Sequence, residues 1–506
     1  MRKNKIFFPA MLIGSLIALI YRWSTKAASP RSVSRKNSFE AVDTYLQKQM
    51  QRLHIPGATM AIVEGDKIVH MRGFGRDRPG GDTPTPQTPF FIGSLTKSFT
   101  ALAVMQLVEA GKVELDAPVQ RYLPWFRVAD PQASTQITVR HLLNQTSGLP
   151  YFPSAAALAD FEDDPGAIER QVRALSTLKL KSPVGAKFAY SNLNFNILGL
   201  IVETTSGEPY ADFVQKNIFD LLEMHHSYST VADAKRDGLA VGHRHWFSLP
   251  LPEPDIPIPA GSLPSGQLIS CAEDMAHYLI AHLNDGRYGN VQILSEAWIA
   301  ELQRGVAEWR VMGMLVGYYG MGWVSQEIDK VRVVSHSGNV PNFSAFMGLV
   351  TEQKRGVIVL LNADPYGLPV ITEEIGMGVT ALLAGQQPAP IKLDFIQWIM
   401  RLLPLLPFLQ VVCVFATQRM LRRWEREPAT RPSGGRLWGQ HILLPLLPNL
   451  TLAGILVYLQ SSGVIHFVAL FMPDLAWVAR ISGGFASIWA ALRTGLVLNI
   501  LIRSRR

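Results

Sequence analysis

Two residues, Ser94 and Lys97, have the types and the spacing of a nucleophile and its base. Residues three apart lie on one face of a helix, so the lysine amine can reach the serine hydroxyl. The next run, 99–110, is apolar on nearly every side and stops at Gly111, which predicts a buried helix. Burial lowers the pKa of a lysine, and a neutral amine can accept the serine proton. Ser94 is therefore a candidate for covalent catalysis.

The Ser-x-x-Lys spacing is weak evidence by itself, because the chain contains it twice. Ser176 and Lys179 repeat it just before Pro183, in a lysine-rich stretch with nothing to bury the amine. We expect this second copy to be a chance match.

A second candidate element is Tyr190-Ser191-Asn192, in a loop just ahead of a predicted helix over 194–205. A tyrosine near a cation can relay a proton, and the amide of Asn192 can orient a substrate carbonyl. Tyr288-Gly289-Asn290 has the same Tyr-x-Asn pattern but lies in a glycine-rich stretch, so we interpret it as a turn.

A third candidate element, His336-Ser337-Gly338, closes a predicted strand, where the glycine would let a ligand approach the backbone. The sequence contains no Gly-x-Ser-x-Gly, no His-Glu-x-x-His and no phosphate loop. His225-His226 and His243-x-His245 have no third ligand at a suitable spacing, so we interpret both pairs as solvated loop residues. We predict no metal and no other cofactor.

The elements that must position these residues are strands near both ends of one domain, with helices between them. A β-hairpin is predicted over 57–72, around Glu64-Gly65-Asp66. Four further strands, joined by short polar turns, are predicted as an antiparallel meander at 320–326, 330–336, 343–351 and 355–363. Helical patterns lie between them at 99–110, 139–146 and 194–205. We expect an α+β fold: an antiparallel sheet flanked by helices, filled from both ends, with an inserted helical region.

The charge distribution separates this domain from the two ends of the chain. The 506 residues carry a net charge of +8, and with 48% hydrophobic residues they are not dominated by disorder. Residues 1–36 contain eight basic residues and no acidic one, and residues 396–506 contain twelve arginines against three acids. Residues 37–395, which lie between these two ends, carry a net charge of −9. Basic charge beside apolar segments is typical of a membrane protein and does not indicate nucleic acid.

Apolar stretches at both ends of the chain predict membrane segments. The apolar run 6–21 predicts a signal peptide or an uncleaved anchor within residues 1–28, and either one would export the domain after it. Two uncharged stretches, 402–418 and 437–459, are long enough to cross a bilayer, and we expect one more crossing within 464–502. The arginine-rich loop between the first two is cytoplasmic by the positive-inside rule. We thus predict an exported domain over 38–390 and about three transmembrane helices within 396–506.

In this order and in these settings, the three elements resemble those of the penicillin-recognising serine hydrolases of the peptidase S12 type. This family comprises class C β-lactamases, D,D-carboxypeptidases, D-aminopeptidases and related esterases. The resemblance covers roughly residues 40–385, with subsidiary matches at 137–150, 259–262 and 319–323.

The resemblance implies a role for each candidate residue. Ser94 would be acylated, Lys97 and Tyr190 would move the proton, and Asn192 would bind the substrate amide. The far wall of the cleft would be formed by His336, Ser337 and Gly338. The backbone N–H groups of Ser94 and Asn339 would form the oxyanion hole.

His336 departs from the pattern of the β-lactamases and transpeptidases, which usually have Lys-Thr-Gly or Lys-Ser-Gly at this element. The lysine supplies a permanent charge for the substrate carboxylate, whereas a histidine is mostly neutral at pH 7 unless a neighbouring acid raises its pKa. This difference favours a peptidase or an esterase over a strong β-lactamase, as in the D-aminopeptidase-type members.

We therefore predict a membrane-anchored, extracytoplasmic serine hydrolase that acts through an acyl-enzyme on D-amino-acid peptides of the cell-wall type or on esters. Its expected partners are a peptide, ester or β-lactam substrate and the lipid bilayer. Two alternatives stay open: a penicillin-binding sensor with weak or no turnover, and a β-lactamase. A module for lipid-linked substrate is a further interpretation of the C-terminal helices. The walls of the pocket come from loops at 150–170 and 240–265, which carry no readable code for the substrate.

Overall fold

The computed structural model describes residues 35–151, 164, 166–255, 259–311, 313–328, 330–391, 394–432, 434–462 and 464–503. The predicted signal peptide or anchor at 1–28 lies outside these ranges. The described residues form two compact units. The larger unit reaches Ile391 but leaves out 246–248, and the smaller unit comprises 246–248 and the helices from Asp394 onward.

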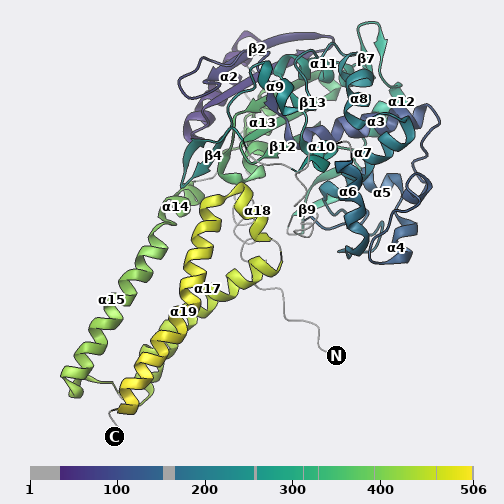
Figure 1. Ribbon diagram of the computed structural model, residues 1–506. Helices are drawn as coiled ribbons and strands as arrows, with labels where there is room; N and C mark the ends of the chain where they lie inside the picture. Colours follow the sequence, from purple (N-terminus) through teal and green to yellow (C-terminus); the bar gives the residue numbers. More distant parts are fainter. Residues whose placement is uncertain are drawn as a thin grey trace. The chain divides into compact units, whose positions relative to one another are not determined.

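The larger unit is built on an antiparallel sheet that has eight strands in the described part of the chain (Figure 1). Its order is β2 (Lys67–Gly75), β1 (Gly57–Glu64), β14 (Arg355–Leu361), β13 (Phe343–Val350), β12 (Val331–Val340), β11 (Trp323–Ile328), β10 (Met314–Gly320) and β9 (Ala307–Val311). The N-terminal hairpin joins the C-terminal strands where β1 pairs with β14, from Ala58 opposite Leu361 to Glu64 opposite Arg355. This confirms the predicted α+β fold with one sheet filled from both ends.

The meander is longer than the sequence pattern predicted. Two strands, β9 and β10, continue the sheet beyond β11 and were missed because they lie at its edge, where Met314 and Leu315 are exposed and apolar residues do not alternate regularly. Strand β12 runs four residues past its expected end at 336, through Gly338 and Asn339 to Val340. Glycine and asparagine are rare in strands, so the pattern stopped too early there.

Helices cover both faces of this sheet. They are α2 (Arg35–Leu53), α11 (Ala272–Leu283) and α13 (Pro369–Leu383). A Cβ added at Gly348 of β13 would touch Thr380 of α13. Gly356 of β14 pairs with Leu349, the residue after Gly348, and a Cβ added at Gly356 would touch Leu283 of α11. Neighbouring positions point to opposite faces of a sheet, so α11 and α13 lie on opposite sides. Helix α2 packs against α13.

A region of helices and short strands is inserted between β2 and β9. Its helices are α3 (Thr96–Glu109), α4 (Pro131–Gln136), α5 (Val139–Leu143), α6 (Ala167–Arg173), α7 (Asn192–Ser206), α8 (Tyr210–Val214), α9 (Val231–Arg236), α10 (Leu263–Gly266) and α12 (Glu296–Leu302), besides α11. The helices predicted at 99–110, 139–146 and 194–205 are thus α3, α5 and α7. Every residue of α3 from Thr96 to Met105 is buried, which confirms the prediction from its apolar surface.

Short strand pairs complete the larger unit. They are β3 (Phe90–Phe91) with β6 (Ile269–Ser270), β7 (Arg287–Tyr288) with β8 (Val291–Gln292), and β4 (His243–Trp246) with β5 (Leu249–Pro252) and β15 (Ala363–Asp364). The segment Tyr288-Gly289-Asn290 forms the turn between β7 and β8, as the sequence indicated.

The interpretation of His243 and His245 as solvated residues is wrong. Both are buried in β4, where their rings donate hydrogen bonds to the main-chain oxygens of Asn362 (3.2 Å) and Leu53 (3.1 Å). The strand pairing of β4 with β15, which comes from more than a hundred residues away, explains why local polarity misled the prediction. Among the described residues there is no group of three or more side chains that could hold a metal ion.

The smaller unit is helical, with α19 packed against α15, α17 and α18. It contains α14 (Asp394–Leu402), α15 (Leu405–Arg426), α16 (Gly434–Arg436), a π-helical stretch (Leu437–Leu443), α17 (Leu444–Ser461), α18 (Val464–Phe471) and α19 (Pro473–Arg503). By length and composition, two helical stretches in the described part of the chain could cross a membrane, Leu437–Ser461 and Pro473–Ile500. The first expected span, 402–418, falls mainly in α15, which ends in an arginine-rich stretch and does not meet this test.

Candidate active site

Ser94 lies in a 3-10 turn, Gly93–Leu95, that leads directly into α3. Lys97 follows in the first turn of that helix, and its Nζ lies 2.9 Å from Ser94 Oγ. Ser94 is partly accessible, whereas Lys97 is completely buried. The spacing of the two residues therefore produces the contact that the sequence predicted.

The second Ser-x-x-Lys copy has a different environment. Ser176 and Lys179 are both exposed to solvent. Lys179 therefore lacks the burial on which a lysine base depends. The two Ser-x-x-Lys motifs thus differ in the burial of their lysine: Lys97 is buried and Lys179 is exposed.

The surroundings of Lys97 favour its neutral form. Its Nζ donates a hydrogen bond to the main-chain oxygen of Ser265 (2.6 Å) and lies 5.0 Å and 5.8 Å from the ring centroids of Tyr190 and Phe195. Burial lowers the pKa of Lys97 well below its ordinary value. A neutral amine keeps N–H donors for Ser265 and presents its lone pair to the Ser94 hydroxyl, as a general base must.

Tyr190 is the second partner of the serine, and its hydroxyl lies 2.9 Å from Ser94 Oγ. Burial raises the pKa of Tyr190 above its ordinary value, so the phenol is protonated and donates this hydrogen bond. The ring packs against Tyr151 and Tyr319, with centroid distances of 5.8 Å and 6.2 Å. Ser94 therefore accepts a hydrogen bond from Tyr190 while its own proton is free to point at Lys97.

The loop that carries Tyr190 is held by Gln145, whose function could not be read from the sequence. Its main-chain oxygen accepts from Ala189 N, and its side-chain oxygen accepts from Ser191 N, both at 2.8 Å. The same side-chain oxygen also accepts from the Asn194 amide. Gln145 has a φ of 57°, a left-handed conformation that is uncommon for a residue other than glycine. The stretch 137–150, only a subsidiary match in the sequence, thus positions Tyr190.

The edge of β12 lies directly against the turn that carries Ser94. Strand β11 pairs with β12 only as far as Ser335, which leaves the rest of β12 open on that side. A Cβ at Gly338 would lie 2.1 Å from the Ile92 oxygen and 3.0 Å from Ser94 N, and one at Gly93 would lie 2.5 Å from Asn339 N. Two glycines therefore permit a backbone approach that places the nitrogens of Ser94 and Asn339 near each other. Such a pair of N–H donors can bind the oxygen of a tetrahedral intermediate.

The side chains of Ser337 and Asn339 lie on the other face of β12. Ser337 Oγ donates to the Glu373 carboxyl (2.9 Å), and Asn339 Nδ2 donates to Asp364 Oδ1 (2.7 Å). Burial raises the pKa of both Glu373 and Asp364. These hydrogen bonds anchor the strand from behind, so the part of Asn339 next to the nucleophile is its backbone.

His336 lies on the same face of β12 as Gly338. Its Nε2 lies 3.4 Å from the Tyr319 hydroxyl, and its Nδ1 lies 2.6 Å from the main-chain oxygen of Ser337. Burial, and then the nearby Lys97, lower the pKa of His336 to about 3. The imidazole is therefore neutral at pH 7, in agreement with the sequence-based expectation. Asn192, in contrast, is exposed at the start of α7, and its side chain has no hydrogen-bond partner among the residues that the structure describes.

Comparisons with known proteins match this architecture. The family model described as Beta-lactamase matches residues 42–375. The protein flp of Staphylococcus aureus (strain MW2) is 27% identical over 342 residues, which cover 67% of this chain and 66% of that protein, slightly less than two thirds of its length. Penicillin-binding protein 4 of Amycolatopsis lactamdurans is 31% identical over 299 residues, covering 56% of this chain and 75% of that protein. The octameric penicillin-binding protein homologue from Pyrococcus abyssi has a similar structure, with a TM-score of 0.60 and 28% identity over 72% of this chain and 81% of that one.

The close approach of Gly93 to β12 can be tested by adding one methyl group. We expect Gly93→Ala to lower kcat for a chromogenic ester by about 10²-fold, because its Cβ would displace Asn339 N and disturb one oxyanion donor. Gly80→Ala is the matched control, since Gly80 also has a positive φ but has nothing within 4 Å of its Cβ position. Equal kcat values in the two variants would contradict the proposed donor pair.

The neutral state of Lys97 predicts a pH dependence. Because a protonated amine cannot accept the serine proton, kcat/KM should fall as the pH drops through the lowered pKa of Lys97. Arginine stays protonated, so Lys97→Arg should lose about 10²–10⁴-fold in kcat/KM and should not recover as the pH rises to 9. Lys179→Arg is the control and should keep the wild-type profile. A Lys97→Arg enzyme with the wild-type pH profile would exclude Lys97 as the base.

Proposed function

The chain belongs to the β-lactamase family, and on this premise we propose that its larger unit is a serine hydrolase in which Ser94 forms the acyl-enzyme. One observation carries the proposal. Ser94 Oγ lies 2.9 Å from both Lys97 Nζ and the Tyr190 hydroxyl, in a turn packed against the open edge of β12. A nucleophile, a desolvated base, a proton relay and two backbone donors meet at one point.

In the proposed acylation, Lys97 takes the proton of Ser94 while Oγ attacks the substrate carbonyl carbon. The carbonyl oxygen becomes negatively charged and is held by the N–H groups of Ser94 and Asn339. When the intermediate collapses, the bond to the leaving group breaks and Tyr190 protonates that group. The lysine ammonium returns its proton to Tyr190, so both residues recover their starting states.

Deacylation follows the same path in reverse. A water molecule gives one proton to Lys97, through Tyr190, and its oxygen attacks the acyl carbon. The bond from that carbon to Ser94 Oγ then breaks, and the serine regains its proton. The product is a carboxylic acid, and the enzyme is restored without any cofactor.

For the substrate, we propose D-amino-acid peptides of the cell-wall type or esters. The neutral His336 supplies no permanent positive charge on β12, which supports a peptidase or an esterase over a strong β-lactamase. A relative named as a penicillin-binding protein supports peptide-like substrates. The alternatives are a β-lactamase and a penicillin-binding protein with weak or no turnover. Product analysis with D-Ala-D-Ala peptides, D-amino amides, nitrocefin and short-chain esters distinguishes the three.

We further propose that the chain is anchored in a cell membrane, with the hydrolase domain on the extracytoplasmic side. The two apolar helical stretches support the anchoring. The arginine-rich segment 419–436 supports a cytoplasmic position for the connection that precedes the first of them, so this topology requires the uncharged stretch 402–418 to cross the membrane as well. The acidic character of 37–395 fits a domain kept away from the anionic inner leaflet.

The assignment of the nucleophile is tested by activity-based labelling. A fluorophosphonate or a fluorescent penicillin should label the native chain and should not label Ser94→Ala, because the variant has no hydroxyl at the reactive position. Ser176→Ala, at the second Ser-x-x-Lys copy, should be labelled like the wild type. Labelling that persists in Ser94→Ala and disappears in Ser176→Ala would transfer the role to Ser176.

The proposed topology is tested in intact cells that express the chain. A membrane-impermeant fluorophosphonate should label Ser94 without lysis, and alkaline carbonate should leave the chain in the membrane pellet. A membrane-permeant probe provides the control for total active enzyme. Labelling by the impermeant probe only after lysis would place the domain inside the cell, and release by carbonate would exclude integral anchoring.

A further inference from the structure

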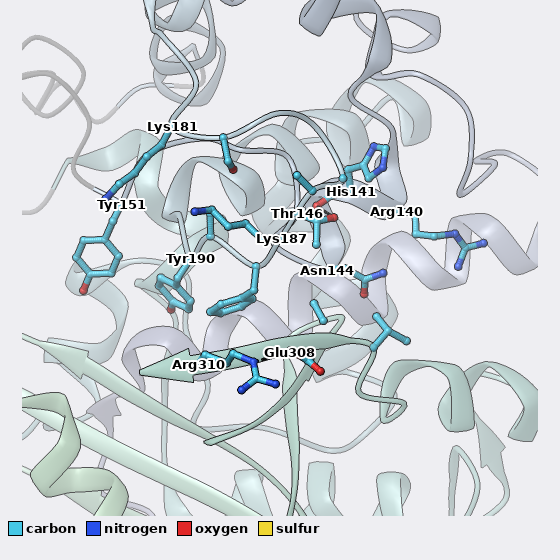
Figure 2. A pocket seen from close by; sticks show the side chains of 17 residues that line it. Arg140, His141, Asn144, Thr146, Tyr151, Lys181, Lys187, Tyr190, Glu308 and Arg310 are labelled. Carbon is cyan, nitrogen blue, oxygen red and sulfur yellow. Dashed lines mark hydrogen bonds and ion pairs between the residues drawn. The ribbon is translucent and has the colours of Figure 1, made fainter. Parts of the chain in front are cut away.

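A cavity of about 760 Å³ lies beside the catalytic tyrosine (Figure 2). Its walls are formed by the residues around the end of α5, by the loop 181–190 and by the start of β9. Tyr190 lines this cavity with its ring and also donates a hydrogen bond to Ser94 through its hydroxyl. A substrate bound at Ser94 could therefore extend past Tyr190 into the cavity.

The lining of this cavity is strongly basic, with four fixed positive charges and one fixed negative charge. Glu308 pairs with Arg310 (2.7 Å), and Arg140 is held by acidic residues. Lys181 and Lys187 are exposed and form no ion pair with any residue that the structure describes. Figure 2 shows both lysines extending toward the side of the cavity where Tyr151 and Tyr190 lie.

This local charge is opposite to that of the surrounding domain. Residues 37–395 carry a net charge of −9, so the basic lining is a local feature and does not reflect the composition of the domain. A concave surface with one sign of charge concentrates ligands of the other sign. The neutral His336 supplies no such charge on β12.

Polar atoms without partners also line the cavity. Asn144 Oδ1 and Ser182 Oγ are buried and have no hydrogen-bond partner in the described part of the chain. A serine hydroxyl can donate to an anion, whereas the unpartnered atom of Asn144 is a carbonyl oxygen and can only accept. The Phe188 and Tyr190 rings supply apolar surface.

We propose that this cavity is a substrate subsite, and that it binds a carboxylate-bearing substituent of the peptide or ester that acylates Ser94. This inference rests on the proposed hydrolase function and adds a charge preference to it. Lys181 and Lys187 attract the carboxylate, Ser182 donates a hydrogen bond to it, and the aromatic rings contact the chain that carries it.

The test uses pairs of substrates that differ only in charge, with the full chain in detergent. One pair places the charge on the acyl side: succinyl-D-alanine p-nitroanilide and its neutral succinamoyl analogue. The other pair places it on the leaving group: acetyl-D-Ala-D-Glu and acetyl-D-Ala-D-Gln. We expect the wild type to prefer the charged member of at least one pair by about fivefold in kcat/KM, and this preference should weaken as salt is added.

The double variant Lys181→Glu/Lys187→Glu should abolish or invert that ratio of kcat/KM values. Lys67→Glu, a charge reversal on the exposed start of β2 outside the cavity, should keep the wild-type ratio. A ratio near one for both pairs in the wild type would overturn the proposal. So would a ratio that the double variant leaves unchanged, or one that Lys67→Glu changes equally.

A binding measurement separates this proposal from the hydrolase function. In Ser94→Ala, which cannot form the acyl-enzyme, isothermal titration should show tighter binding of the charged compounds than of their neutral analogues. If the wild type turns over none of these compounds while Ser94→Ala still binds the charged members more tightly, the proposed catalysis is rejected and the subsite is kept. Turnover of both members of each pair, together with equal binding of both by Ser94→Ala, would reject the subsite and keep the hydrolase.

Discussion

The burial of Lys97 without a carboxylate partner is the constraint on which the rest of the site depends. Among the described residues its Nζ contacts the Ser94 hydroxyl, one main-chain oxygen from Ser265 and two aromatic rings, and no acid pairs with it. An isolated ammonium ion is costly in such surroundings, so burial lowers the pKa of Lys97 and favours the neutral amine. The buried helix α3 brings the lysine into this environment, and Phe195 of α7 and Ser265 of α10 complete it. The packing of the helical region is thus also what makes the lysine a base.

Strand β12 belongs to the sheet and lies against the turn that carries Ser94, and its two faces make different contacts. The face with His336 and Gly338 meets the turn of Ser94, where only a residue without a side chain fits at 338. The other face is tied down by Ser337 and Asn339, which hydrogen-bond to the buried carboxyls of Glu373 and Asp364. A backbone donor has to be held rigidly to stabilise charge that develops during a reaction. The sheet and α13 provide that rigidity from behind the site.

The family fold leaves the choice of substrate to the residues around this common centre. In this chain the position at the active-site end of β12 holds the neutral His336, whereas the cavity beside Tyr190 is lined by Lys181 and Lys187. The tyrosine belongs to both places, because it donates to Ser94 and also forms part of the cavity wall. In the proposed mechanism and subsite, catalysis and selection by charge therefore meet at one residue. The arginines of the C-terminal part of the chain have a different setting, because they flank two helical stretches that could cross a membrane by length and composition.

The sequence by itself determined the features that depend on near neighbours along the chain. The spacing of Ser94 and Lys97, the apolar helix after them, and the alternation in the hairpin and meander predicted the nucleophile, its base and the α+β class. The sequence also indicated which Ser-x-x-Lys copy is buried, whereas only the tertiary structure brought Tyr190 to a serine 96 residues away. It likewise assigned Gln145 to the Tyr190 loop, placed His243 in a buried strand, and added the edge strands β9 and β10 to the sheet. Burial, loop positions and strand neighbours arise from contacts between distant segments, which a local pattern of residue types does not contain.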